Sequence, residues 1–148
     1  MLRTSGKHQR QEASRSLNLL VFLIGGRRLA MKTQEVAGIS PWETSIPVAS
    51  RTPFVTAVVR RHQVVLPVFD LAKLLRVSVQ GSSPLCLTAK HPQGDMAICI
   101  DEEIPVLQTL DAAAIQAYRG KDVPAEWSYA SGLDEIPILS VHRLGAVA

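Results

Sequence analysis

The chain has 148 residues, of which 47% are hydrophobic and 20% are charged, a composition typical of one globular domain. That length is sufficient to bury a sizeable core without metal or disulfide cross-links. The net charge of +3 lies within residues 1–16, which hold four basic residues and one acidic residue, whereas residues 17–148 hold 12 of each. The neutral body excludes an overall positive field of the kind that attracts nucleic acid.

The first 16 residues contain no large apolar side chain beyond Met1 and Leu2. This composition predicts a disordered basic tail at 1–16, followed by a folded domain over 17–148. An arm that binds a membrane surface or nucleic acid is the alternative for the tail. The tail lacks the apolar stretch and cleavage site of a signal peptide, and the apolar run Leu19–Ile24 is far shorter than the ~20 residues that span a bilayer. We therefore expect a cytoplasmic protein without direct membrane insertion.

A β-hairpin is predicted at the start of the domain. The apolar run 17–24 is followed by Gly25-Gly26, a strong turn signal, and then by the alternating polar and apolar residues 28–32. The next segment, 34–38, has the length of one helical turn ended by glycine. Two prolines within 39–48 restrict that segment to an edge strand or a loop.

The most informative segment is 56–69, with the sequence TAVVRRHQVVLPVF. Two β-branched runs flank the polar patch Arg60-Arg61-His62-Gln63, which predicts a strand, a tight polar turn and a second strand. Asp70 is a suitable N-cap for a short helix over 71–75. The patch is the one compact basic cluster of the body. It is interpreted either as a solvated turn or as a tip that binds a partner, since arginine is a common anchor at interfaces.

A second hairpin is predicted from 85–89 and 96–101, with its turn at 91–95, and 104–107 is expected to continue the sheet. The acidic run Asp101-Glu102-Glu103 is interpreted as a solvated turn at a strand end. Paired carboxylates for acid–base catalysis normally come from different elements and converge in a cleft.

The Ala-rich segment 109–118 is predicted to form a helix closed by Gly120. The last two strands are predicted at 128–133 and 136–141, with a turn at Asp134-Glu135. Short apolar runs separated by turn residues are typical of an all-β domain.

The residues that usually carry chemistry have structural explanations. The four histidines are isolated from one another, so they do not indicate a metal site, and Cys86 and Cys99 lie in apolar runs as small buried hydrophobic residues. No nucleophile with a positioned base and no phosphate-binding loop occurs. We expect no enzymatic activity, no metal and no cofactor.

The order of the predicted elements resembles the CheW family of chemotaxis coupling proteins. Residues 64–71, Val-Val-Leu-Pro-Val-Phe-Asp-Leu, are similar to the family's most specific signature, in which apolar residues, proline, two apolar residues and Asp-Leu precede a short helix. The hairpin at 17–31, the turn with Glu35-Val36 and the closing segment 130–141 resemble the family in order and spacing. The resemblance covers about residues 17–145.

This resemblance implies a mainly-β fold of two small interlocked five-stranded β-barrels with short helices. It also implies a non-catalytic adaptor that couples the cytoplasmic tips of chemoreceptors to the regulatory domain of a CheA-type histidine kinase, at membrane-associated receptor arrays. A pathway for swimming and one for pili and twitching are both compatible with it. The alternative of a different class is a small-barrel protein that binds nucleic acid.

The chain departs from the family at the central turn. Family members carry Gly, two apolar residues and Asn-Leu-Arg-Gly before the second central strand, and here the family's interface arginine is His62 and its turn glycine is Gln63. Glutamine takes positive φ less freely than glycine, so either the turn has changed shape or the positive charge has moved to the two arginines. The candidate partner-binding residues are Glu35, Val36, Val58, Val59, Arg60, Arg61, His62 and Gln63.

Overall fold

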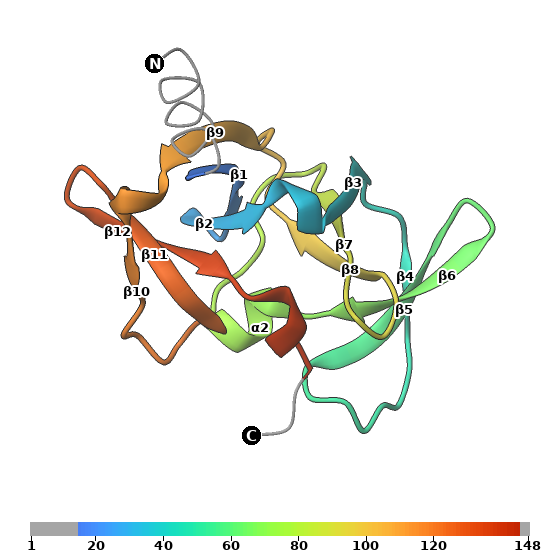
Figure 1. Cartoon of the computed structure of the whole chain (residues 1–148). Coiled ribbons are helices and arrows are strands. Elements are labelled where there is room, and N and C mark those ends of the chain that lie inside the picture. The colour runs from blue at the N-terminus through green and yellow to red at the C-terminus, as the bar shows by residue number, and fades with distance from the viewer. Residues whose placement is uncertain (1–14, 146–148) are drawn as a thin grey trace, which may run out of the picture.

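The computed structural model describes residues 15–145, which form two six-stranded sheets (Figure 1). Sheet A has the order β10-β11-β12-β2-β1-β9 and sheet B the order β3-β7-β8-β6-β5-β4. The strands of sheet A are β1 (Ser16–Ile24), β2 (Arg27–Lys32), β9 (Val106–Asp111), β10 (Ile115–Ala117), β11 (Ala125–Ser131) and β12 (Asp134–Leu139). Those of sheet B are β3 (Val36–Pro41), β4 (Ser45–Pro47), β5 (Val55–Arg61), β6 (Val64–Phe69), β7 (Leu85–Ala89) and β8 (Met96–Ile100). The helical segments are η1 (Thr33–Glu35), α2 (Leu71–Leu75), η2 (Ala112–Ala114) and η3 (Val141–Arg143).

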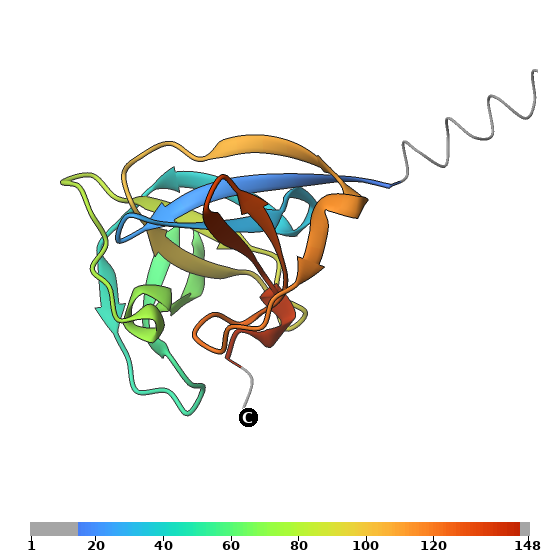
Figure 2. The same ribbon diagram turned by 90° about the vertical axis from the view of Figure 1, so that its left-hand side faces the viewer.

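The two sheets exchange strands between the halves of the chain. The first half gives β1–β2 to sheet A and β3–β6 to sheet B, and the second half gives β7–β8 to sheet B and β9–β12 to sheet A. Each exchanged hairpin joins its sheet on both sides, through a parallel contact (β2 with β12, β8 with β6) and through antiparallel pairing (β1 with β9, β7 with β3). Figure 2 shows β9 running alongside β1, the strand with which it pairs. In each sheet the two edge strands are consecutive in the chain: β9 and β10 in sheet A, and β3 and β4 in sheet B. When each of these pairs is counted as one bent strand, the sheets become the two interlocked five-stranded barrels predicted from the sequence.

The largest core cluster lies between the two sheets and belongs to both. Its buried members include Phe22, Ile24, Leu29 and Met31 from sheet A and Leu87, Ile98 and Ile100 from sheet B. A smaller cluster lies inside each barrel, around Val59 and Val68 in sheet B and around Tyr129 and Ile136 in sheet A. Because the largest apolar cluster needs side chains from both sheets, the two barrels form one structural unit.

The predicted helix over 109–118 is wrong. This segment forms the end of β9, the single turn η2 and β10. Leu110 pairs with Leu17 and Ile115 with Tyr129, and both side chains pack against the core of sheet A. The three alanines form only the bend between the two strands, since helix propensity is a weak preference that strand pairing and burial override.

Three predicted boundaries also shift. The last turn lies at Gly132-Leu133 instead of Asp134-Glu135, because Gly132 adopts the positive φ (61°) that the turn requires. The predicted helical turn at 34–38 is the 3-10 turn η1, and Val36 begins a strand. The strand expected from residue 104 begins at Val106. The hairpin β7–β8, its turn and the helix α2 with its Asp70 cap are confirmed, and the Asp70 carboxylate accepts the Lys73 N–H at 3.0 Å.

The Gly25-Gly26 turn is confirmed, but the interpretation of Asp101 as part of a solvated turn is wrong. Both glycines have positive φ (60° and 80°), as a type I′ turn requires. Asp101 is only 3% exposed, and its carboxylate accepts the backbone N–H groups of Gly25, Gly26 and Gln80, each at 2.8 Å. This Asp101 anchor joins the end of β8 to the β1–β2 turn and to the segment before β7. Glu102 and Glu103 are exposed, as predicted.

The segment between β10 and β11 is held to β2 by a polar cluster. The Asp122 carboxylate accepts hydrogen bonds from the Tyr118 hydroxyl and from the Arg27 guanidinium, the latter at 2.6 Å. The Tyr118 hydrogen bond, followed by that of Arg27, lowers the pKa of Asp122 below its usual value. Tyr118, whose pKa is raised by burial and by Asp122, is neutral at physiological pH.

We predict a small, pH-dependent cost for Asp122→Asn. A lowered folded-state pKa means that the carboxylate adds stability above its unfolded pKa of about 3.9, and that this stability is lost as the pH falls through the folded value. Because Arg27 and Asp122 are partly exposed, the loss at pH 7 should be about 0.5 kcal/mol or less. Urea unfolding at pH 7 and below pH 3 measures it, and a difference from wild type that persists unchanged at the lower pH would contradict the assignment.

No helix within residues 15–145 is long and apolar enough to cross a membrane. Of the predicted tail at 1–16, residues 1–14 lie outside the described part of the chain. Ser16 is the first residue of β1.

Candidate partner-binding surface

The β5–β6 hairpin carries six of the eight residues singled out from the sequence. Strand pairing continues to Arg61 and Val64, which leaves His62-Gln63 as a two-residue turn. His62 has a φ of 56° and Gln63 has no positive φ, the distribution found in type II′ turns. The turn therefore differs in shape from one that needs glycine at the position of Gln63, which was one of the two alternatives raised by the sequence.

The side chains of β5 alternate between the barrel interior and the outside. Val59 is only 2% exposed and packs in the core of sheet B, whereas Val58 is half-buried. Arg60 is exposed and Arg61 is half-buried. Of the two valines and two arginines proposed to contact a partner, Val59 supports the hairpin from within and Arg60 is the most accessible.

Exposed apolar residues beside this basic turn were not singled out from the sequence. Val64 and Val65 are 57% and 58% exposed on β6, and Ile46 is 64% exposed on the edge strand β4, where it pairs with Val58. The signal was present in the sequence as two consecutive valines, of which a strand can direct only one toward the core. We define the β5–β6 tip as residues 60–65.

Arg61 connects the hairpin to two other strands of sheet B. Its guanidinium donates a hydrogen bond to Thr88 Oγ1 on β7 and lies against Gly38 on β3. A Cβ atom at Gly38 would lie 2.6 Å from Arg61 Nη2, so glycine leaves the space that the guanidinium fills. Arg61 thus links β5 to β7 and lies against β3, whereas Arg60 takes part in neither contact.

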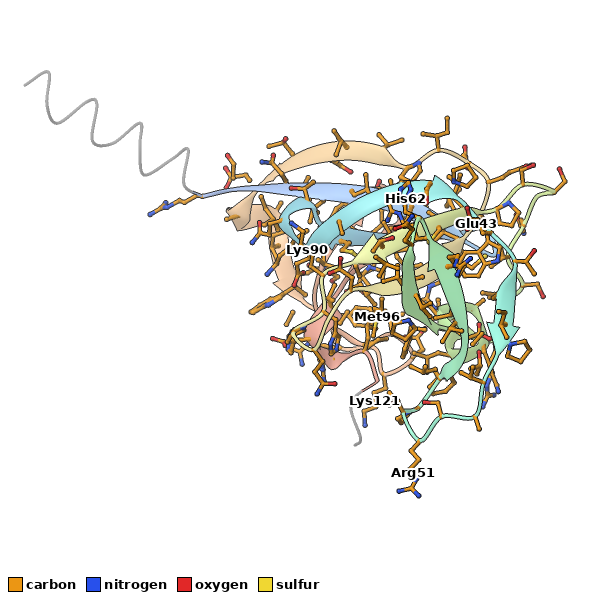
Figure 3. The ribbon with its side chains drawn as sticks, turned by 90° about the vertical axis from the view of Figure 1, so that its right-hand side faces the viewer. Glu43, Arg51, His62, Lys90, Met96 and Lys121 are labelled. Atoms are coloured by element: carbon orange, nitrogen blue, oxygen red, sulfur yellow. The ribbon has the colours of Figure 1, made fainter. Side chains whose placement is uncertain are left out.

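A pocket of about 190 Å³ lies at the base of the tip. Its lining is Ser40, Pro41, Glu43, Val59, Arg60, Arg61, His62 and Cys86. Apart from His62, the lining carries two positive formal charges, Arg60 and Arg61, and one negative charge, Glu43. Figure 3 shows Glu43 and His62 near one another at one end of the molecule, with Arg51 at the opposite end.

The remaining pair of predicted residues, Glu35-Val36, lies where η1 ends and β3 begins. Both are half-buried, the Glu35 carbonyl accepts the Lys90 N–H at 2.8 Å, and Val36 packs against the main core. They lie two and three residues before Gly38, which Arg61 contacts. Val36 therefore belongs to the same sheet as the hairpin, and Glu35 belongs to the turn that precedes it.

The two cysteines lie directly opposite one another on β7 and β8. Cys86 is buried as predicted, whereas Cys99 is half-buried, and both are free thiols. Burial raises the pKa of both, that of Cys99 to about 11, so both are protonated thiols of low reactivity at neutral pH. Over residues 15–145, no group of three or more histidine, cysteine and acidic side chains could hold a metal ion.

The chain matches the family model described as the CheW-like domain over residues 18–146. It is similar to a solved structure, the scaffolding protein TtCheW from Thermoanaerobacter tengcongensis, with a TM-score of 0.71 and 13% sequence identity. That similarity covers 86% of this chain and 90% of that chain, and at this identity it shows the fold alone. The comparison with curated proteins found no match.

Proposed function

The chain belongs to the CheW-like domain family, and from this premise we propose that it is a non-catalytic adaptor of a bacterial chemosensory complex. In this proposal it couples the cytoplasmic tips of chemoreceptors to the regulatory domain of a CheA-type histidine kinase, at arrays on the inner face of the membrane. The pathway served is one for swimming or one for pili and twitching.

The observation that carries the proposal is the presence of exposed apolar residues on two different sheets. The β5–β6 tip belongs to sheet B. Ile104, Val106 and Leu107, at the start of β9 and just before it, are 79%, 63% and 72% exposed and belong to the sheet A side. Figure 1 places β9 and the tip on different sides of the molecule. An adaptor needs two such surfaces in order to bind two partners at once, and exposed apolar clusters commonly mark protein interfaces.

In this proposal, different residues of the tip make different contributions to binding. Val64 and Val65 supply apolar area that is buried on binding, and Arg60 supplies a charge at the rim that directs orientation. Contacts of this size are modest individually, and repetition in an array strengthens them.

The first test is a titration of the full chain against the kinase regulatory domain and the receptor tips encoded by the same genome. Binding to at least one of them at micromolar concentration is expected. Absence of binding to both would overturn the proposal. Salt-sensitive binding to single-stranded nucleic acid in its place would favour the alternative of a nucleic-acid-binding barrel.

We predict that Arg60→Glu weakens binding of the kinase domain about tenfold and leaves the unfolding temperature unchanged, because Arg60 is exposed and takes no part in the packing of the barrel. Arg51→Glu is the matched control, since it makes the same charge change at an exposed arginine remote from the tip (Figure 3). Isothermal titration calorimetry of the two variants decides the point. Equal affinities would show that the tip is not the contact.

A further inference from the structure

We propose that the pocket at the base of the β5–β6 tip recognises one carboxylate side chain, an aspartate or glutamate of a partner protein, and that Arg61 binds it. This inference rests on the proposed function for the identity of the partner. The pocket's capacity to bind a carboxylate follows from its own residues and is testable without the partner.

The first argument is the state of the Arg61 guanidinium. It is half-buried, and among residues 15–145 none of the ion pairs includes Arg61 or Arg60. A guanidinium has five N–H donors, and the hydrogen bond to Thr88 uses one of them. A partly buried arginine with free donors and no ion-pair partner among the described residues is suited to a planar carboxylate, which it binds through two parallel hydrogen bonds.

The second argument is preorganisation. Gly38 leaves the space for the guanidinium and Thr88 fixes its direction, so Arg61 is held in place before a ligand arrives. Gly38 itself has no positive φ, which means that the backbone does not require glycine there. The missing side chain at residue 38 therefore serves the position of Arg61. An arginine already fixed in its binding conformation loses less conformational entropy when it binds.

The third argument is the size and charge of the pocket. Its volume of about 190 Å³ is below the ~300–1,000 Å³ of sites for drug-sized ligands, and it accommodates a carboxylate with its stem. Arg60, Arg61 and Glu43 give the lining a formal charge of +1, which one carboxylate neutralises. Glu43 opposes a doubly charged phosphate, and the neutral body offers no field for a polyanion.

The partner-independent experiment is an NMR titration of the ¹⁵N-labelled full chain with sodium acetate at constant ionic strength. The amides of Gly38 and Thr88 and the Arg61 Nε–H group should shift saturably, with a dissociation constant of about 10–100 mM, the strength of one charge-assisted pair. Glu43→Gln should tighten acetate binding severalfold. Gly38→Ala should weaken it to a non-saturating response by displacing the guanidinium, and the amide spectrum reports that the variant is folded.

Three results of this titration would overturn the inference. The first is an unsaturable response of the wild type, and the second is a Gly38→Ala variant that binds acetate like the wild type. The third is inorganic phosphate binding at least tenfold more tightly than acetate, which would identify a phosphate site.

The second experiment measures the affinity of the kinase regulatory domain and of the receptor tips. Arg61→Lys keeps the charge but loses the planar donor pair, and it should weaken binding of one partner about tenfold, as should Gly38→Ala, whereas Arg51→Lys should not. Undiminished binding of both partners by Arg61→Lys and Gly38→Ala overturns the inference and leaves the adaptor function intact. Failure of the wild type to bind either partner overturns the proposed function, and the acetate titration then decides on the pocket alone.

Discussion

Asp101→Asn should lower the free energy of unfolding by about 3–4 kcal/mol. In the folded protein the carboxylate accepts three backbone N–H groups at 2.8 Å, two of them on one oxygen. An amide replaces one accepting oxygen by a donor, which leaves at least one partly buried N–H without a partner, and it removes the charge that strengthens the other hydrogen bonds. Urea unfolding followed by circular dichroism at pH 7 measures the loss.

The matched control is Glu103→Gln, two residues away in the same acidic run. Glu103 is exposed, so the same chemical change should alter stability by less than about 0.5 kcal/mol. Equal effects of the two substitutions would mean that the Asp101 anchor adds no net stability. Because the anchor joins β8 to the β1–β2 turn, the loss in Asp101→Asn should appear as one cooperative shift of the whole transition and not as local fraying.

Gly25→Ala should cost about 3–4 kcal/mol, and Gly26→Ala about 1–2 kcal/mol. Both glycines adopt positive φ in the same turn, so either substitution places an alanine in a strained left-handed backbone conformation. A Cβ atom at Gly25 would lie 2.6 Å from Val77 Cβ, whereas one at Gly26 would approach only the end of the Gln80 side chain, at 3.4 Å. The difference between the two variants therefore measures the steric overlap at Gly25, which is mainly with Val77 and includes a closer approach, 3.1 Å, to the Ser78 carbonyl oxygen.

Thermal and urea unfolding of both variants test this ranking. Equal costs would show that Val77 moves aside freely, and that backbone strain is the whole penalty. Each glycine also donates its N–H to Asp101, so combining either substitution with Asp101→Asn should give less than the sum of the single effects.

The sequence predicted local structure well where one short segment carries the whole signal. The Gly-Gly turn, the Asp70 cap and the central hairpin each depend on neighbouring residues, and each is found where it was expected. The role of Asp101 could not be foreseen in this way, because its partners Gly25 and Gly26 lie 76 and 75 residues away along the chain. A charged residue in an acidic run gives no local sign that distant N–H groups will surround it.

The helix expected over 109–118 failed for a related reason. Alanine favours a helix in isolation, but the flanking Leu110 and Ile115 find strand partners and a core that only the folded sheet provides. The candidate site was predicted at the level of the hairpin and not of its individual residues. Arg60 and Arg61 are the same residue type in adjacent positions, so composition does not distinguish them. Strand alternation exposes Arg60, and the space at Gly38 accommodates the guanidinium of Arg61.

The exchange of hairpins between the two halves has a consequence for synthesis. Sheet A begins with the first strand of the chain and is completed only by β9–β12, so β1 and β2 leave the ribosome long before their sheet can close. Sheet B waits as well, because its first strand β3 is an edge strand that pairs with β7, and the largest apolar cluster requires side chains of both sheets. Chains cut between α2 and β7 should therefore remain unfolded and prone to aggregation as separate fragments, and fold only when both pieces are present together.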